Sequence, residues 1–298
     1  MAAILYHPFA WLLVVACSGV HGALNFKIFN DPKSVVTKEG RSSCTSNAVA
    51  CTPVDIDAIA ADGALKSQDK EDYCLLKHYF PGVCEGRYLE IGAGDGIEYS
   101  NSWVFYNSND WKGVNVELNP DSYDELVRNR RNDIANIQAA VCSDTEQPVH
   151  YAHGVAGGTH VGGIWEFTTE PFREQFWPGL TLFHTIELMC TPIQSILDRT
   201  LGNNKKHYFD FATIDIEGAE LNSLLGIDWS RTKFGILLVE KSKSSKINQQ
   251  MHDLLKAKGY TLMENDEDDC GIRNWYYKND EFDQIYSRIR APLDQGWV

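Results

Sequence analysis

Basic residues and long apolar runs are both scarce in this chain. Its 298 residues contain 27 Lys and Arg against 41 Asp and Glu, a formal net charge of −14. Because nucleic-acid-binding proteins gather Lys and Arg to neutralise phosphates, this charge argues against a nucleic-acid partner. The nearest basic cluster, Lys241, Lys243 and Lys246, lies in a Ser-rich stretch and is interpreted as a solvated helix entry. The composition, 43% hydrophobic and 23% charged, is typical of a globular protein.

The N-terminal 22 residues, MAAILYHPFAWLLVVACSGVHG, contain no Lys, Arg, Asp or Glu. Their apolar run, Phe9 to Val20, is shorter than the ~20 residues needed to cross a bilayer and ends in small residues. This pattern predicts a secretory signal peptide from Met1 to about Gly22, and hence a secreted protein or one of the ER or Golgi lumen. An uncleaved N-terminal anchor is the alternative, because the usual positive residues are missing. No later segment is apolar enough to span a membrane.

Cysteine use fits such a compartment, where disulfide bonds persist. Seven cysteines remain after the predicted cleavage, and the odd number means that at least one stays free or pairs between chains. No C-x-x-C motif is present, which argues against zinc or thioredoxin-like chemistry. Proximity in sequence favours Cys44–Cys51 and Cys74–Cys84, with Cys190–Cys270 as a third pair; Cys142 is then expected to be a buried free thiol.

The chain divides into an N-terminal extension over residues 23–86, a main domain over 87–280 and a C-terminal tail over 281–298. In the main domain, short apolar runs alternate with amphipathic segments, a pattern that predicts an α/β, doubly wound, mostly parallel sheet. The expected strands are 88–91, 113–117, 137–141, 209–214, 234–239, 260–263 and 275–277. The expected helices are 69–80 in the extension, then 99–107, 122–130, 193–200, 219–225 and 247–258.

A Gly-rich and aromatic interval, about 149–190, interrupts this alternation. Long connections inside a compact domain usually form lids or binding surfaces. We assign this insertion to the acceptor side of a binding site.

A glycine-rich turn follows the first strand of the main domain. It reads Glu90-Ile-Gly92-Ala93-Gly94-Asp-Gly96, and the second strand ends in Glu117. Glycines allow close approach of a ligand to the backbone, and an acid at the next strand end can accept ribose hydroxyls, so a nucleoside-containing cofactor is expected. The spacing departs from the G-x-G-x-x-G of dinucleotide sites. A carboxylate at Glu90 favours a cationic ligand, which S-adenosylmethionine satisfies.

Several segments resemble the FkbM-type S-adenosylmethionine-dependent methyltransferases: YLEIGAGDGIEYS, GVNVELNP, NIQAAVCSD, the CTPIQSILD block leading into FDFATIDIEGAELNSLLG, and ILLVE. The resemblance implies a Rossmann-like methyltransferase fold with a seven-stranded sheet. It implies that the cofactor is bound by Glu90, Gly92, Ala93, Gly94, Gly96, Glu117, Leu118 and Ala140, with Glu117 on the ribose and Leu118 and Ala140 beside the adenine.

Asp215 and Glu217 match the acidic motif that this family carries beside the reactive methyl group. A carboxylate with a raised pKa can take the proton of a hydroxyl acceptor, and two acids spaced i, i+2 can instead share a divalent cation. We therefore expect Asp215 as base or metal ligand and Glu217 as its partner, although Glu217 could merely cap the next helix.

The sequence favours a secretory-pathway O-methyltransferase that acts on a small-molecule or glycan acceptor. Two other functions stay open: a secreted binding or signalling protein that keeps the fold without activity, and a nicotinamide-dependent oxidoreductase, which the glycine spacing disfavours.

Overall fold

The computed structural model describes residues 33–36, 44–143, 145–153, 161–265 and 267–294. The signal peptide predicted for residues 1–22 lies outside these ranges. Within them, no helix is both long and apolar enough to pass through a membrane.

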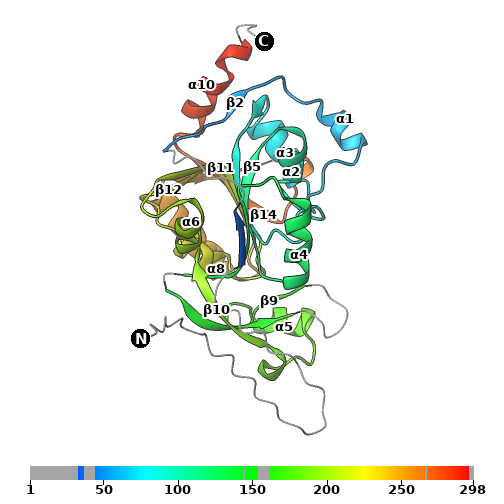
Figure 1. The fold of residues 1–298 in the computed structure, drawn as a ribbon, viewed down its shortest axis with the longest axis vertical. Coiled ribbons are helices and arrows are strands. Elements are labelled where there is room, and N and C mark those ends of the chain that lie inside the picture. Colours follow the sequence, from blue (N-terminus) through cyan, green and yellow to red (C-terminus); the bar gives the residue numbers. More distant parts are fainter. Residues whose placement is uncertain (1–32, 37–43, 144, 154–160, 266, 295–298) are drawn as a thin grey trace, which may run out of the picture.

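A mostly parallel sheet forms the centre of the molecule (Figure 1). Its strand order is β1-β6-β5-β4-β11-β12-β14-β13. The strands are β1 (Lys33–Val36), β6 (Ala135–Gln138), β5 (Lys112–Glu117), β4 (Arg87–Ile91), β11 (His207–Ile214), β12 (Thr232–Glu240), β14 (Asn274–Asn279) and β13 (Tyr260–Leu262). The five strands from β6 to β12 run parallel, whereas β14 is antiparallel to both β12 and β13. This confirms the predicted doubly wound α/β fold with its seven-stranded sheet; β1, from the N-terminal extension, adds an eighth strand antiparallel to β6.

Helices cover both faces of this sheet, each over its own apolar core (Figure 1). One face carries α6 (Ile193–Leu201), α7 (Glu220–Leu225) and α8 (Ser245–Ala257). The other carries α2 (Glu71–Cys74), which continues as the π-helical turn η1 (Leu75–Tyr79), together with α3 (Trp103–Ser108) and α10 (Phe282–Asp294). Next to them lies α4 (Pro120–Asn129), which begins where Asn119 accepts hydrogen bonds from the backbone of its first turn.

The segment expected as a single strand over residues 137–141 is broken at Ala139. Up to Gln138 it pairs with β5 in the main sheet, and from Ala140 it forms β7 (Ala140–Cys142) in a second sheet. That sheet has the order β7-β10-β8-β9 and contains β8 (Gln147–Ala152), β9 (Gly163–Ile164) and β10 (Ile186–Pro192). With α5 (Glu170–Phe176) and the 3₁₀ turn η2 (Leu182–His184), it forms a layer below the main sheet in Figure 1.

Both ends of the main domain contact further elements. The extension contributes α1 (Ile56–Ala61) and the short pair β2 (Val49–Ala50) and β3 (Val83–Cys84). At the other end, α10 buries Phe282 and Tyr286 in the same core as Phe80 of the extension. The tail predicted for 281–298 therefore includes a packed helix, while the domain boundaries stay predictions.

The expected disulfide pairs were wrong, and so was the free cysteine. The bonds are Cys51–Cys84, Cys74–Cys270 and Cys142–Cys190, and Cys44 is free and exposed. Strand pairing explains two of them: β2 lies beside β3, and β7 beside β10, so the paired cysteines come from neighbouring strands. In the third, α2 lies against α9 (Glu267–Cys270) across a separation of 196 residues, which proximity in sequence could not reveal.

Candidate active site

A cavity of about 610 Å³ lies at the carboxyl edge of the parallel strands, between the main sheet and the insertion. This volume is within the range of small-ligand sites, ~300–1,000 Å³. Of the ten residues predicted from sequence, eight line it: Glu90, Gly92, Gly94, Glu117, Leu118, Ala140, Asp215 and Glu217. Ala93 and Gly96 do not, because they face α4. Ala93 is buried against Tyr123 and Leu126, and a Cβ at Gly96 would meet Leu126 Cδ1 at 2.7 Å.

The glycine loop after β4 requires glycine for two different reasons. Gly92 has φ +87°, and a Cβ on it would lie 1.8 Å from the backbone oxygen of Asp215. At Gly94, with φ +54°, the nearest atom to such a Cβ is 3.9 Å away, so the backbone is open to the cavity. Gly92 thus joins the loop to the end of β11, while Gly94 leaves room for a ligand.

Glu117, at the end of β5, is joined directly to this loop. Its carboxylate accepts hydrogen bonds from the backbone N–H of Gly94, at 2.8 Å, and of Asn119, at 2.6 Å. Burial raises the pKa of Glu117 to about 7. A carboxylate has about four acceptor positions, so it can still accept two ribose hydroxyls. Beyond it, Leu118 and Ala140 belong to one apolar cluster, a suitable surface for a flat ring.

Glu90 lines the cavity, but its carboxylate is held by the chain itself. It accepts from the backbone N–H of Asn101 at 2.8 Å and from the hydroxyls of Ser100 and Ser102, and Arg130 lies 3.6 Å away. The side chain therefore shapes the loop that follows the glycines. In the same loop, the Asn101 amide donates to Thr213 Oγ1 at 2.8 Å, and both residues line the cavity.

Four acidic side chains meet where β11 and β12 end: Asp215, Glu217, Glu220 and Glu240. Ile214 pairs with Val239 in the parallel register, which places Asp215 beside Glu240, and their carboxyl groups share a hydrogen bond. Glu220 instead accepts from the backbone N–H of Ile216 and Gly218, so it stabilises the turn.

Burial and mutual repulsion hold these acids partly protonated near neutral pH. Burial, then the charge of Asp215, raises the pKa of Glu217 to about 8 and that of Glu240 to about 10. The pKa of Asp215 is also raised by burial. Glu217 additionally has a left-handed backbone, φ 56°, which is uncommon for a residue other than glycine and is found at functional sites. The group can therefore accept or hold a proton at the cavity wall.

The structure adds no support for a metal at Asp215 and Glu217. In the described parts of the chain, no group of three or more His, Cys, Asp or Glu side chains is arranged to hold a metal ion.

Sequence reasoning did not assign Glu240 or Arg273 to the site, and it interpreted Lys241 and Lys243 only as part of a solvated helix entry, whereas all four line the same cavity. Glu240 and Lys241 directly follow an expected strand, so the rule that parallel strands end at one edge could have found them. The insertion also lines the cavity, through Tyr151, Phe167, Phe172 and Phe176 among others.

A glycine loop after one strand and an acid after the next, at the carboxyl edge of a doubly wound sheet, define the class of α/β proteins that bind nucleoside cofactors. The sequence model of one family, described as "Methyltransferase FkbM domain", matches residues 90–262, more than half of the chain. The chain belongs to this FkbM methyltransferase family.

Comparison with curated proteins gives no match. Among solved structures, the chain is similar to an O-methyltransferase from Bacillus cereus in complex with SAH, at 16% identity and a TM-score of 0.35, covering 74% of this chain and 86% of that one. It is also similar to the fibrillarin pre-rRNA processing protein of Methanococcus jannaschii, at 11% identity and a TM-score of 0.34, covering 65% of each chain. A fibrillarin from Aeropyrum pernix with natively bound S-adenosyl-L-methionine has 10% identity and a TM-score of 0.35, covering 65% of this chain and 66% of that one. The chain thus spans just under two thirds of these two fibrillarins.

Proposed function

We propose that this protein is an S-adenosylmethionine-dependent O-methyltransferase of the secretory pathway that methylates a hydroxyl of a sugar or glycoconjugate. The observation that carries the proposal is the Glu117 carboxylate, hydrogen-bonded to the Gly94 backbone on the wall of the cavity. In a member of the FkbM methyltransferase family, the Glu117 carboxylate is suited to bind the ribose of the cofactor, and the Gly94 backbone is suited to contact the group attached to that ribose.

The chain's own residues fit this cofactor. Glu117 would hold the ribose hydroxyls, and Leu118 and Ala140 would contact the adenine. The open backbone at Gly94 would face the methionine part, and the carboxylates of Asp215 and Glu217 suit a cationic ligand. When bound, S-adenosylmethionine supplies a methyl group on a positively charged sulfur.

Asp215 and Glu217 would act on the acceptor. A hydroxyl is a poor nucleophile, so a base that removes its proton accelerates transfer, and such a base works best with a pKa near the working pH. Burial raises the pKa of Asp215, the expected base, and it raises the pKa of its partner Glu217 to about 8. Glu240, hydrogen-bonded to Asp215, would keep that carboxylate in place.

Three disulfide bonds support a secreted or lumenal protein, because such bonds persist in oxidising compartments. The polar and aromatic side chains that the insertion adds to the cavity, such as Thr168 and Phe172, favour a polyhydroxylated acceptor over a purely apolar one.

The test is transfer of a labelled methyl group from S-adenosylmethionine to a panel of glycans and glycosides. We expect transfer by the purified protein and a loss of at least ~100-fold in Asp215→Asn, the typical contribution of a general base. Glu125→Gln, on the exposed face of α4, is the matched control and should keep full activity. A folded protein that binds no S-adenosylmethionine would instead support the non-catalytic binding protein.

A further inference from the structure

Three basic side chains line the part of the cavity farthest from Glu117. The strands end there in the order β5, β4, β11 and β12, and β14 begins beside the end of β12. Along this edge, Glu117 comes first, then the glycine loop, then Asp215; Lys241 and Lys243 follow β12, and Arg273 precedes β14. The acids therefore lie between the predicted cofactor side and the basic residues. We call Lys241, Lys243 and Arg273 the basic edge.

None of the three cations forms a direct salt bridge with a carboxylate in the part of the chain that the structure describes, and Lys243 and Arg273 are exposed. Lys243 Nζ donates to Gln175 Oε1 at 2.6 Å and lies 4.7 Å from the centre of the Phe176 ring. Lys241 Nζ lies 4.3 Å over Trp275. Some other cations of this acidic protein do form salt bridges; Arg231, for example, bridges Asp198 and Asp228.

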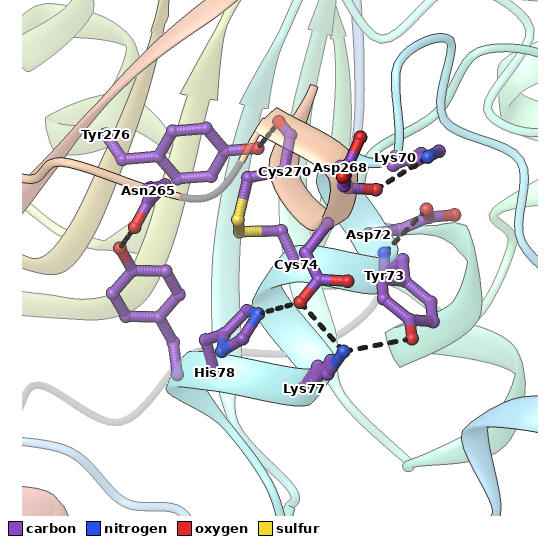
Figure 2. The surroundings of a disulfide bond; sticks show 12 residues. Lys70, Asp72, Tyr73, Cys74, Lys77, His78, Asn265, Asp268, Cys270 and Tyr276 are labelled. Atoms are coloured by element: carbon purple, nitrogen blue, oxygen red, sulfur yellow. Dashed lines mark hydrogen bonds and ion pairs between the residues drawn. A yellow bond between two sulfur atoms is a disulfide. The ribbon is translucent and has the colours of Figure 1, made fainter. Parts of the chain in front are cut away.

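The segment that leads to Arg273 is held in position by the N-terminal extension (Figure 2). The figure shows the Cys74–Cys270 disulfide and the side chains of Lys77 and His78, both of which contact the carboxylate of Asp269, at 2.7 and 2.9 Å. Just after Cys270, the backbone N–H groups of Ile272 and Arg273 donate to the Asp69 carboxylate at 2.6 and 2.9 Å.

A backbone hydrogen bond also fixes Lys241 relative to Arg273, because the N–H of Lys241 donates to the carbonyl of Arg273 at 2.9 Å. The N-terminus of α8 directly follows Lys243, and Ile247 of its first turn lines the cavity, so the helix dipole adds to the positive potential there.

We infer that the methyl acceptor carries an anionic group, a carboxylate, phosphate or sulfate, which the basic edge binds while the acceptor hydroxyl faces Asp215 and Glu217. This inference rests on the proposed function and narrows its substrate class. Lys and Arg side chains that line a cavity without a carboxylate partner gain charge-assisted hydrogen bonds from such a group, and these are stronger than bonds between neutral partners.

The competing explanation is that the cations only offset the buried acids. Lys243 and Arg273 do act in that sense, because their charges lower the raised pKa of Glu217. The two explanations differ in one measurable respect: only the first predicts a saturable anion site on the protein.

The test uses inorganic sulfate, titrated into the purified full chain at constant ionic strength and followed by calorimetry and by tryptophan fluorescence, to which Trp275 beside Lys241 contributes. The protein is first saturated with S-adenosylhomocysteine, and the titration is repeated without it. The test variant is Lys243→Gln/Arg273→Gln, and Arg288→Gln, on the exposed side of α10, is the matched control.

We expect saturable sulfate binding that is at least ~10-fold weaker in the double variant and unchanged in the control, since each charge-assisted bond is typically worth ~1.5–3 kcal/mol. Displacement of sulfate by glucuronate, glucose 6-phosphate or glucose 6-sulfate identifies the preferred anion. Equal sulfate binding by wild type and double variant, or equal displacement by glucose, overturns the inference. Failure of S-adenosylhomocysteine to bind instead contradicts the proposed function, and the titration without it still tests the anion site.

Discussion

Replacing both Cys74 and Cys270 with alanine should destabilise the protein more than removal of either of the other two disulfide bonds. This bond joins the N-terminal extension to the segment before β14, and both of its cysteines are buried. Around it, Lys70 donates to the carbonyl of Asp268, and the Tyr276 hydroxyl donates to the carbonyl of Cys270 (Figure 2).

The magnitude follows from the length of chain that each bond closes. With a sequence separation of 196 for Cys74–Cys270, restriction of the unfolded chain is worth about 5 kcal/mol in the loop-closure relation. The same relation gives about 4 kcal/mol for Cys142–Cys190, with a separation of 48, and slightly less for Cys51–Cys84, with 33. Measured losses are commonly smaller, so we expect about 3–5 kcal/mol for the longest loop.

Guanidinium unfolding of the three double-alanine variants, each compared with wild type, measures these losses. A reductant should abolish most of the difference between wild type and Cys74→Ala/Cys270→Ala, because it opens the same bond. If this variant loses less stability than Cys51→Ala/Cys84→Ala, loop closure does not govern the contribution of these bonds, and the reasoning is refuted.

Two further predictions concern the site. Gly92→Ala should lower the free energy of unfolding in urea by about 2–5 kcal/mol, because the new Cβ clashes with the Asp215 backbone and φ is left-handed. The control Gly63→Ala, with φ +66° and no atom within 4 Å, should lower it by only about 1–2 kcal/mol. Equal losses in the two variants would contradict the close approach of Gly92 to Asp215. The second concerns pH. Because burial raises the pKa of Glu217 to about 8 and of Glu240 to about 10, the folded state keeps protons that the unfolded state releases above its ordinary pKa of 4.5. The unfolding free energy should therefore fall as pH rises from about 5 to 9, by up to about 1.4 kcal/mol per pH unit for each such proton. Glu240→Gln should flatten this profile, and an unchanged slope in pH-dependent chemical unfolding would refute the assignment.

The main sheet could be predicted from sequence because its parallel strands are buried on both faces and therefore appear as short apolar runs. Strand ends differ by a residue or two, as for β11, expected at 209–214 and observed as His207–Ile214. The break at Ala139 could not be predicted, because the segment Ile137-Gln-Ala-Ala-Val141 contains no glycine or proline that would mark a strand end. Only the insertion, which supplies β10 as a new partner for β7, explains why the chain changes sheets there.

The site was predictable where it depends on strand ends and not where it depends on distant packing. Glu117, Asp215 and Glu217 follow apolar runs directly, so their place at one edge follows from a parallel sheet. Arg273 follows no such run; it reaches the cavity because β14 is antiparallel to β12 and because Asp69 holds its backbone.

The most direct test of the central claim is a calorimetric titration of the purified protein with S-adenosylmethionine and S-adenosylhomocysteine, alongside Glu117→Ala and the control Glu125→Gln. The account predicts one site per chain with micromolar affinity. It also predicts a loss of ~30-fold or more in Glu117→Ala, since two hydrogen bonds to a carboxylate are worth at least ~2 kcal/mol, and no change in the control. Absence of binding by the folded wild-type protein, or undiminished binding by Glu117→Ala, would contradict it.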